Sequence, residues 1–219
     1  MVTGRAGARP TEAAAMPEFK SQYESCPEVC GRMESPGLAL DMPIWVDHTR
    51  DETTVDQARI ETELDKMSLS GGNILHVGLG NSRFAQRFAG RVNLIDGLTV
   101  SRNEKAVADA LGIGNYTAYF LNKYSREFIL TIKNKYDFVI DNNMASFACC
   151  KYHFYLMLDN YLWSMKPGAL ILTDQQGMDW VIEDPRWKLT YEDLAALENK
   201  FPVRAARITD TVFSIQAVK

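Results

Sequence analysis

The chain has 219 residues and a net charge of −4, from 24 lysines and arginines against 28 aspartates and glutamates. Apolar residues make up 46% of the composition and charged residues 24%, as in average soluble globular proteins. This composition excludes a disordered chain and a fibrous repeat. It also excludes an integral membrane protein, since no uncharged run approaches the roughly 18 residues that a span needs. The acidic balance argues against nucleic acid as a partner and favours a small, cationic substrate.

The N-terminal quarter predicts two segments outside the main domain. Residues 1–20 are rich in Gly, Ala and Pro and have no apolar signal-peptide core, which predicts a disordered leader. Residues 21–53 are irregular and predict an N-terminal lid or arm. The cysteines lack the second Cys or His pair of a zinc site, so we predict reduced thiols, no metal and a cytoplasmic location; they are Cys26, Cys30, Cys149 and Cys150.

From residue 54 to about residue 173, helical patterns alternate with short apolar runs. The patterns predict helices over 54–68, 81–89, 102–111, 124–132 and 147–165. The apolar runs predict strands over 73–77, 92–95, 116–120, 136–140 and 169–173. Strands that alternate with helices in this way are typical of a parallel sheet built from βαβ units.

The last thirty residues follow a different pattern. A helix is predicted over 190–200, and two strands over 202–208 and 212–218 are separated by only three residues. So short a link cannot form a helical crossover, and it therefore predicts an antiparallel hairpin at the sheet edge. The predicted fold class is α/β, with a Rossmann-like, seven-stranded, mostly parallel sheet and a C-terminal antiparallel hairpin.

A glycine-rich turn follows the first predicted strand, in the segment from His76 to Ser82. Glycines at such a turn let the backbone approach a ligand. A dinucleotide fingerprint would have a third glycine at position 83, where this chain has Arg83. The turn therefore predicts a ligand without a diphosphate.

A carboxylate, Asp96, follows the second predicted strand, 18 residues after Gly78. A carboxylate at that point can accept hydrogen bonds from both hydroxyls of a ribose. A nucleoside that has no pyrophosphate and binds at the carboxyl edge of a parallel sheet points to S-adenosylmethionine.

On these motifs, residues 54–219 resemble the class I S-adenosylmethionine-dependent methyltransferases. The matching segments are His76–Asn81, Asp96, Tyr136–Asn142 and Leu162–Thr173. The resemblance implies S-adenosylmethionine as methyl donor, S-adenosylhomocysteine as product, and one cofactor-binding domain. Two positions depart from the family, which usually has acids at His76 and Asn122. The implied cofactor contacts are Gly78, Gly80, Asn81, Ser82, Asp96, Gly97, Leu98, Asn122, Asp141 and Asn142.

Catalytic and substrate-binding residues are expected at the same sheet edge. Asp141 ends the fourth predicted strand and is predicted to hold the nucleophile, with His153 as proton acceptor or as a packing residue. The predicted substrate contacts are Asp47, His48, Asn143, Asp174 and Gln175. Residues 41–65 hold eight acids and two bases, and residues 174–198 hold seven and two. These stretches are either solvated helical faces or a funnel for a cationic substrate.

The predicted function is methyl transfer to an amine on a small molecule. The short chain and unusual N-terminal arm are similar to natural-product methyltransferases, and most of all to aminoglycoside N-methyltransferases of the gentamicin type in antibiotic biosynthesis. Three alternatives stay open. The first is an aminopropyltransferase resembling spermidine synthase, although Asn142 and Asn143 replace the further carboxylates of that family. The second is an O-methyltransferase with Asp141, Asn142 and Asp174 around Mg²⁺. The third is a non-catalytic binding protein.

Overall fold

A computed structural model describes residues 48–146, 148, 151–180 and 188–218 of the chain. The predicted leader over 1–20 lies outside the described residues, as do residues 21–47 of the predicted lid, which include Asp47, and the four cysteines. Within the described part, each helix is too short or too polar to cross a bilayer.

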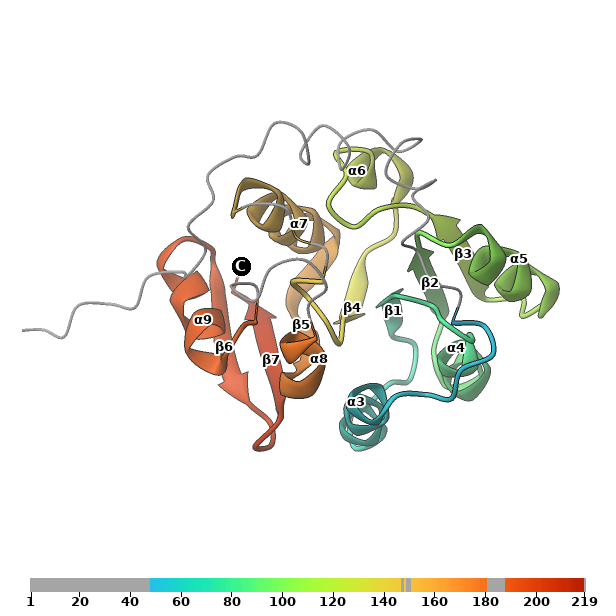
Figure 1. The fold of residues 1–219 in the computed structure, drawn as a ribbon, viewed down its shortest axis with the longest axis horizontal. Helices are drawn as coiled ribbons and strands as arrows, with labels where there is room; N and C mark the ends of the chain where they lie inside the picture. The colour runs from blue at the N-terminus through green and yellow to red at the C-terminus, as the bar shows by residue number, and fades with distance from the viewer. Residues whose placement is uncertain (1–47, 147, 149–150, 181–187, 219) are drawn as a thin grey trace, which may run out of the picture.

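Seven strands form a single sheet in the order β3-β2-β1-β4-β5-β7-β6 (Figure 1). Strands β1 to β5 pair in parallel, whereas β7 is antiparallel to both β5 and β6. This confirms the predicted α/β fold with its C-terminal antiparallel hairpin. The strands are β1 (Asn73–Val77), β2 (Leu94–Thr99), β3 (Tyr116–Phe120), β4 (Tyr136–Ile140), β5 (Met165–Asp174), β6 (Val203–Arg207) and β7 (Val212–Ala217).

Helices cover both faces of the sheet, with α6 and α7 on one side and α3 and α4 on the other (Figure 1). The α-helices are α3 (Val55–Asp65), α4 (Arg83–Phe88), α5 (Arg102–Ala110), α6 (Phe128–Thr131), α7 (Lys151–Ser164), α8 (Gln175–Asp179) and α9 (Tyr191–Ala196). Two 3₁₀ turns, η1 (Ala89–Arg91) and η3 (Leu197–Asn199), extend α4 and α9. Helix α9 begins with a capping box, in which the Thr190 hydroxyl and the Asp193 carboxylate each accept a backbone N–H of the other residue.

The central strands are apolar on both faces because each face is covered by helices. On one face, Ile74 and Ile140 pack with the buried residues of α3 and α4. On the other face, Leu75 and Val139 pack with the buried residues of α6 and α7. The alternation along β1 and β4 therefore joins two hydrophobic clusters into one three-layer domain.

Two strands are longer than the sequence predicts. Strand β2 continues through Gly97 to Thr99, so the prediction that it ends at Ile95 is wrong and Asp96 lies in mid-strand. Strand β5 begins at Met165 rather than at Ala169. The pairing of β4 with β5 shifts register next to Pro167 and Gly168, and such a bulge accommodates a proline that cannot donate a ladder hydrogen bond.

Gly97 has a packing role in β2. A side-chain carbon at this position would overlap the Leu79 side chain and crowd the Tyr116 ring. We expect Gly97→Ala to lower the free energy of unfolding by about 1–3 kcal/mol, because overpacking strains a buried site. Urea denaturation checks this value. An unchanged free energy of unfolding would contradict this packing role.

Candidate cofactor and acceptor site

A cavity of about 750 Å³ lies where the segments after β1, β2, β3 and β4 meet the start of α3 and the end of α8. Ligand sites in proteins usually measure about 300–1,000 Å³. Open parallel sheets bind ligands at this carboxyl edge, where the strand order reverses between β1 and β4. The cavity is therefore the candidate functional site.

The glycine-rich turn forms one wall of the cavity. Gly78 and Gly80 have φ angles of 80° and 48°, in the left-handed region that favours glycine. Asn81 holds the turn in place, since its Nδ2 donates to the Asp51 carbonyl (2.7 Å) and its Oδ1 accepts from the Arg83 N–H (2.9 Å). Ser82 also has a positive φ, but it is fully buried against the Tyr116 hydroxyl and lies outside the cavity lining.

Glu104 supplies a carboxylate to the wall beside β2. It occupies the first turn of α5, and the hydroxyl of the N-cap residue Ser101 accepts the Glu104 N–H. Its Oε2 accepts from the Thr99 hydroxyl at the end of β2 (2.5 Å), and its Oε1 accepts from the His48 N–H (3.3 Å). The buried Glu104 carboxylate is thus fixed at the point where β2 enters the cavity.

Asp96 lies elsewhere. It pairs with Leu75 in the middle of β1, and its Oδ2 accepts from the Tyr136 hydroxyl (2.6 Å) and from Asn134 Nδ2 (2.7 Å). Tyr136 is the first residue of β4, so these contacts lie toward the opposite end of the sheet from the cavity. Burial and Asp96 raise the pKa of Tyr136, which keeps its hydroxyl protonated as the donor.

Asp141 lines the cavity at the end of β4 and forms a buried ion pair with Lys123. Lys123 Nζ lies 2.9 Å from Asp141 Oδ2 and 2.7 Å from the Asn143 carbonyl oxygen. The Tyr161 hydroxyl donates to the same Asp141 oxygen (2.8 Å). Burial lowers the pKa of Lys123, and Asp141 acts in the opposite direction. The Asp141 carboxylate is therefore held by the chain's own donors.

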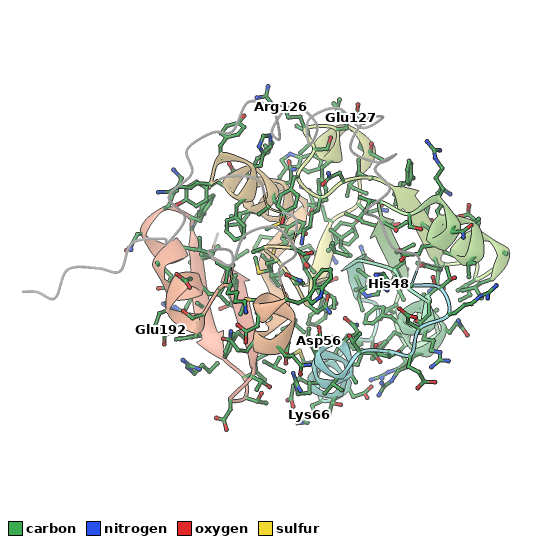
Figure 2. The ribbon with its side chains drawn as sticks, viewed as in Figure 1. His48, Asp56, Lys66, Arg126, Glu127 and Glu192 are labelled. Atoms are coloured by element: carbon green, nitrogen blue, oxygen red, sulfur yellow. The ribbon has the colours of Figure 1, made fainter. Side chains whose placement is uncertain are left out.

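Asp56 contributes another carboxylate to the cavity wall, between α3 and α8 (Figure 2). Asp56 Oδ2 accepts from Asn142 Nδ2, the residue after Asp141. Gly177 in α8 allows this approach, because a side chain there would overlap the Asn142 carbonyl oxygen and lie 2.8 Å from Asp56 Oδ2. The end of β4, α3 and α8 are thus joined at one point of the cavity wall.

Asn143 completes this wall and has a buried acceptor without a partner. Its Nδ2 donates to the Trp180 carbonyl oxygen (2.8 Å), which fixes the orientation of the amide. Its Oδ1 is buried and receives no hydrogen bond from the described residues. An unsatisfied buried acceptor costs about 1–3 kcal/mol. A ligand N–H or O–H at Asn143 would remove that cost.

The cavity wall is strongly acidic. Among the described residues that line it are seven carboxylates and one cationic side chain, Lys123. The carboxylates belong to Asp51, Glu52, Asp56, Glu61, Glu104, Asp141 and Asp179. Asp141 pairs with Lys123, Glu61 with Arg87 and Glu52 with Arg83, and the remaining carboxylates leave the wall with an excess of negative charge, which attracts cations. The described residues contain no group of three or more His, Cys, Asp or Glu placed to hold a metal ion.

Solved structures of methyltransferases share this arrangement of strands and helices. The N-methyltransferase NodS from Bradyrhizobium japonicum WM9, in complex with S-adenosylhomocysteine, matches 86% of this chain and 100% of its own, with a TM-score of 0.59 and 11% identity. A S-adenosylmethionine-dependent methyltransferase from Aquifex aeolicus matches 84% of this chain and 97% of its own, with a TM-score of 0.52 and 17% identity.

The fold is that of the class I methyltransferases. No protein-family model and no curated protein matches the sequence. Because the identities to the solved structures are below one fifth, the comparison shows the fold, and the chemistry must be argued from the residues of the site.

Within the class I methyltransferase fold, many of the predicted site residues meet at the cavity. The lining includes Gly78, Gly80, Asn81, Leu98, Asn122, Asp141, Asn142, Asn143 and His48. Ser82, Asp96, Gly97, His153, Asp174 and Gln175 lie outside it. Asp174 is fully buried and forms a bidentate ion pair with Arg59 (2.8 and 2.6 Å). Gln175 donates to the Leu189 carbonyl oxygen. His153 is buried in α7.

Sequence reasoning missed several lining residues of this methyltransferase fold. Glu104, Lys123 and Asp56 each bring a charge to the cavity, and Trp180 brings an aromatic ring. Glu104 stands five residues after Thr99, in the first turn of α5, and this spacing is the local signal from which it could have been found. Lys123 and Asp56 are recognisable only through partners 18 and 86 residues away.

His76 lies in β1 just before the glycine turn, where its ring stacks on Phe84 with centroids 4.3 Å apart. Burial lowers the pKa of His76 from 6.5 to about 3, and its Nδ1 is buried without a hydrogen-bond partner among the described residues. A lowered pKa means that the folded state favours the neutral ring. The resulting stability is complete above pH 6.5 and declines as the pH falls toward 3.

We therefore expect acid to destabilise the protein through His76 by about 3 kcal/mol at pH 4 relative to pH 7. The variant His76→Leu removes the titrating group and should lose less stability over the same interval. Urea denaturation of both proteins at pH 7, 5.5 and 4 measures the difference. Parallel pH dependence in the two proteins would show that His76 does not resist protonation.

Proposed function

We propose that this protein transfers a methyl group from S-adenosylmethionine to an amine on a small, cationic molecule. The observation that carries the proposal is the single cavity that joins the glycine turn and Glu104 to an acidic wall beyond Asp141. One side of the cavity suits a nucleoside, and the other suits a cation. A non-catalytic binding protein, the third hypothesis from the sequence, would not require one side for a nucleoside and another for a cation.

The residues of the β1–β2 side fit the cofactor. The turn at Gly78 and Gly80 brings backbone close to the ligand, and the buried Glu104 carboxylate can accept both hydroxyls of a ribose. Leu98 and Leu121 offer an apolar surface to the base, next to the polar side chain of Asn122. In this assignment Glu104 takes the ribose role that the sequence suggested for Asp96.

When bound, S-adenosylmethionine supplies a methyl group on a cationic sulfur, and the acceptor lone pair forms the new C–N bond as the C–S bond breaks and sulfur becomes neutral. The task of the chain is alignment. The ion pair of Asp141 with Lys123 and the bond of Asp141 to Tyr161 fix the end of β4, from which Asn142 and Asn143 project into the cavity wall. Asp141 thus acts as a positioning residue.

The acidic wall supports an amine acceptor over a phenol or an acid. The carboxylates that line the cavity outnumber the cations that pair with them, and this excess of negative charge favours a molecule that carries positive charge in solution. Amino sugars and aminoglycosides have this property, and we place them first among the acceptors. The N-methyltransferase NodS, which shares the fold, is also named for transfer to nitrogen.

Metal-dependent O-methylation has less support from the same residues. Two of its expected ligands, Asp141 and Asp174, are bound by Lys123 and Arg59 of the chain itself. Asp174 also accepts the Gln176 N–H at the start of α8 and does not line the cavity. A magnesium site would require both ion pairs to break.

Calorimetric titration tests the cofactor half of the proposal. We expect S-adenosylmethionine and S-adenosylhomocysteine to bind with micromolar affinity and one-to-one stoichiometry. Incubation with S-adenosylmethionine and a panel of amino sugars should then add the mass of one methylene unit to an acceptor and generate S-adenosylhomocysteine. An excess of chelator should leave this transfer unchanged. Binding of neither nucleoside would overturn the proposal.

A further inference from the structure

Resting on the proposed function, we propose that the acceptor carries at least two amino groups. A charged ammonium binds beside Asp56 and Trp180, and a second, neutral nitrogen binds at Asn143 and receives the methyl group. The site would therefore select diamines and polyamines over monoamines of the same shape.

The acidity of the cavity opposes methylation of a lone amine. A nitrogen needs its lone pair to form a bond, so the reacting amine must first lose its proton. Neighbouring carboxylates raise the pKa of an amine and hold that proton in place. A wall with seven carboxylates therefore suits an ammonium that binds and does not react. Attraction and reaction are compatible when they involve different nitrogens.

Asp56 has the features of an ammonium anchor. It is 7% exposed, and among the described residues the hydrogen bond to its carboxylate comes from the neutral amide of Asn142. Arg59 is the basic residue of α3, and its guanidinium donates to both oxygens of Asp174. Its positive charge therefore acts on two carboxylates, those of Asp174 and Asp56. The group keeps a net negative charge. Trp180, 49% exposed, adds an aromatic ring to the same wall, and ammonium ions bind such rings.

Asn143 has the features of a site for a neutral amine. It is 8% exposed, and its Oδ1 has no donor in the part of the chain that the structure describes, while the other end of its amide is held by Trp180. An amine N–H donates to this oxygen without carrying a charge. Lys123 lies against the Asn143 carbonyl oxygen (2.7 Å), and its ion pair with Asp141 leaves no net charge beside Asn143, so this part of the wall does not hold a proton on the reacting nitrogen. The cavity's one cationic side chain among the described residues is thus beside the place where a deprotonated nitrogen is needed.

The balance of the transfer follows from this arrangement. The reacting nitrogen releases its proton to water before it binds at Asn143. Its lone pair then forms the C–N bond, the C–S electron pair stays on sulfur, and the positive charge moves from sulfur to the product nitrogen. The bound product therefore carries two ammonium groups in an acidic cavity. The ammonium beside Asp56 has the same charge before and after the transfer.

The test begins with the complex of the protein with S-adenosylhomocysteine, whose formation is measured first. Failure at this step would overturn the proposed function as a whole. The complex is then titrated with 1,3-diaminopropane, putrescine, cadaverine and 2-deoxystreptamine, each compared with the analogue in which a hydroxyl replaces one amino group, which nearly keeps the shape and loses one charge. We expect at least one diamine to bind roughly tenfold tighter than its hydroxyl analogue. Equal or weaker binding of every diamine would overturn the inference alone.

Two variants separate the roles of the nitrogens. Asp56→Asn should abolish the preference for the diamine, whereas Asp65→Asn, the same change in α3 outside the cavity, should retain it. Asn143→Leu should lower the rate of methyl transfer to the best-bound diamine by roughly tenfold or more with a smaller effect on its Kd, because the anchor remains. Both variants should bind S-adenosylhomocysteine as wild type does. A diamine preference that survives Asp56→Asn would contradict the assignment of the anchor.

Discussion

Replacement of Glu104 by glutamine should weaken S-adenosylhomocysteine binding by a factor of about 10 to 100, because hydrogen bonds to a charged group contribute about 1.5–3 kcal/mol. Glutamine keeps the length of the side chain and its bond to the Thr99 hydroxyl, but its amide nitrogen cannot accept the His48 N–H, so the effect combines the lost charge with one lost acceptor. Ribose hydroxyls would donate to an amide oxygen instead of a carboxylate. Isothermal titration at constant pH measures the change in Kd.

Asp96→Asn is the matched control for Glu104→Gln, since each variant removes one charge from a buried carboxyl group of the β2 region. We expect the control to lower the free energy of unfolding, because Tyr136 and Asn134 lose a charged acceptor. Its affinity for S-adenosylhomocysteine should stay within about threefold of wild type, as expected for a distant site. The opposite pattern, with affinity lost only in Asp96→Asn, would return the ribose contact to Asp96.

Lys123→Met should destabilise the protein by about 3–5 kcal/mol, which is the usual cost of leaving a buried charge without its partner. The side chains of Lys123 and Asp141 are 10% and 3% exposed, so little water is available to solvate the Asp141 carboxylate once the ammonium is gone. Chemical denaturation at pH 7 measures this loss.

Lys166→Met supplies the comparison for this variant. Lys166 pairs with Asp137 at 2.7 Å, close to the separation in the buried pair, but the two side chains are 39% and 33% exposed. We expect a cost of about 1 kcal/mol or less, as for most solvent-exposed ion pairs. Double replacement of Lys123 by Met and Asp141 by Asn should be more stable than Lys123→Met alone. If it is not, the unpaired charge is not the cause of the loss.

The parts of the fold that the sequence predicted well are those set by local pattern. The strands β1, β3 and β4 lie where the apolar runs placed them. Strands β1 and β4 lie inside the sheet and are apolar because both faces are covered, whereas β3 is an edge strand that its aromatic residues mark. The hairpin was also predictable, since three residues between β6 and β7 leave room for one kind of connection. The glycine turn was recognisable because its residues are adjacent in the chain.

The parts that the sequence did not predict depend on distant partners. Asp96 was expected to end a strand, yet it sits inside β2 because Tyr136 and Asn134, some forty residues later, satisfy its carboxylate. The start of β5 was misplaced because Pro167 and Gly168 usually interrupt strands, and here a register shift absorbs them. Asp174 seemed available for substrate until Arg59, 115 residues earlier, was found to bind it.

The position of β7 in the sheet also has a consequence for how the protein is made. Strand β7 lies between β5 and β6, although it is synthesised after both. During translation β6 therefore emerges before the strand that connects it to the sheet exists, and β5 keeps an unpaired edge until β7 follows. The ribosome must release residues 212–217 before either gap closes, so the sheet is completed only after the whole cavity wall has been synthesised.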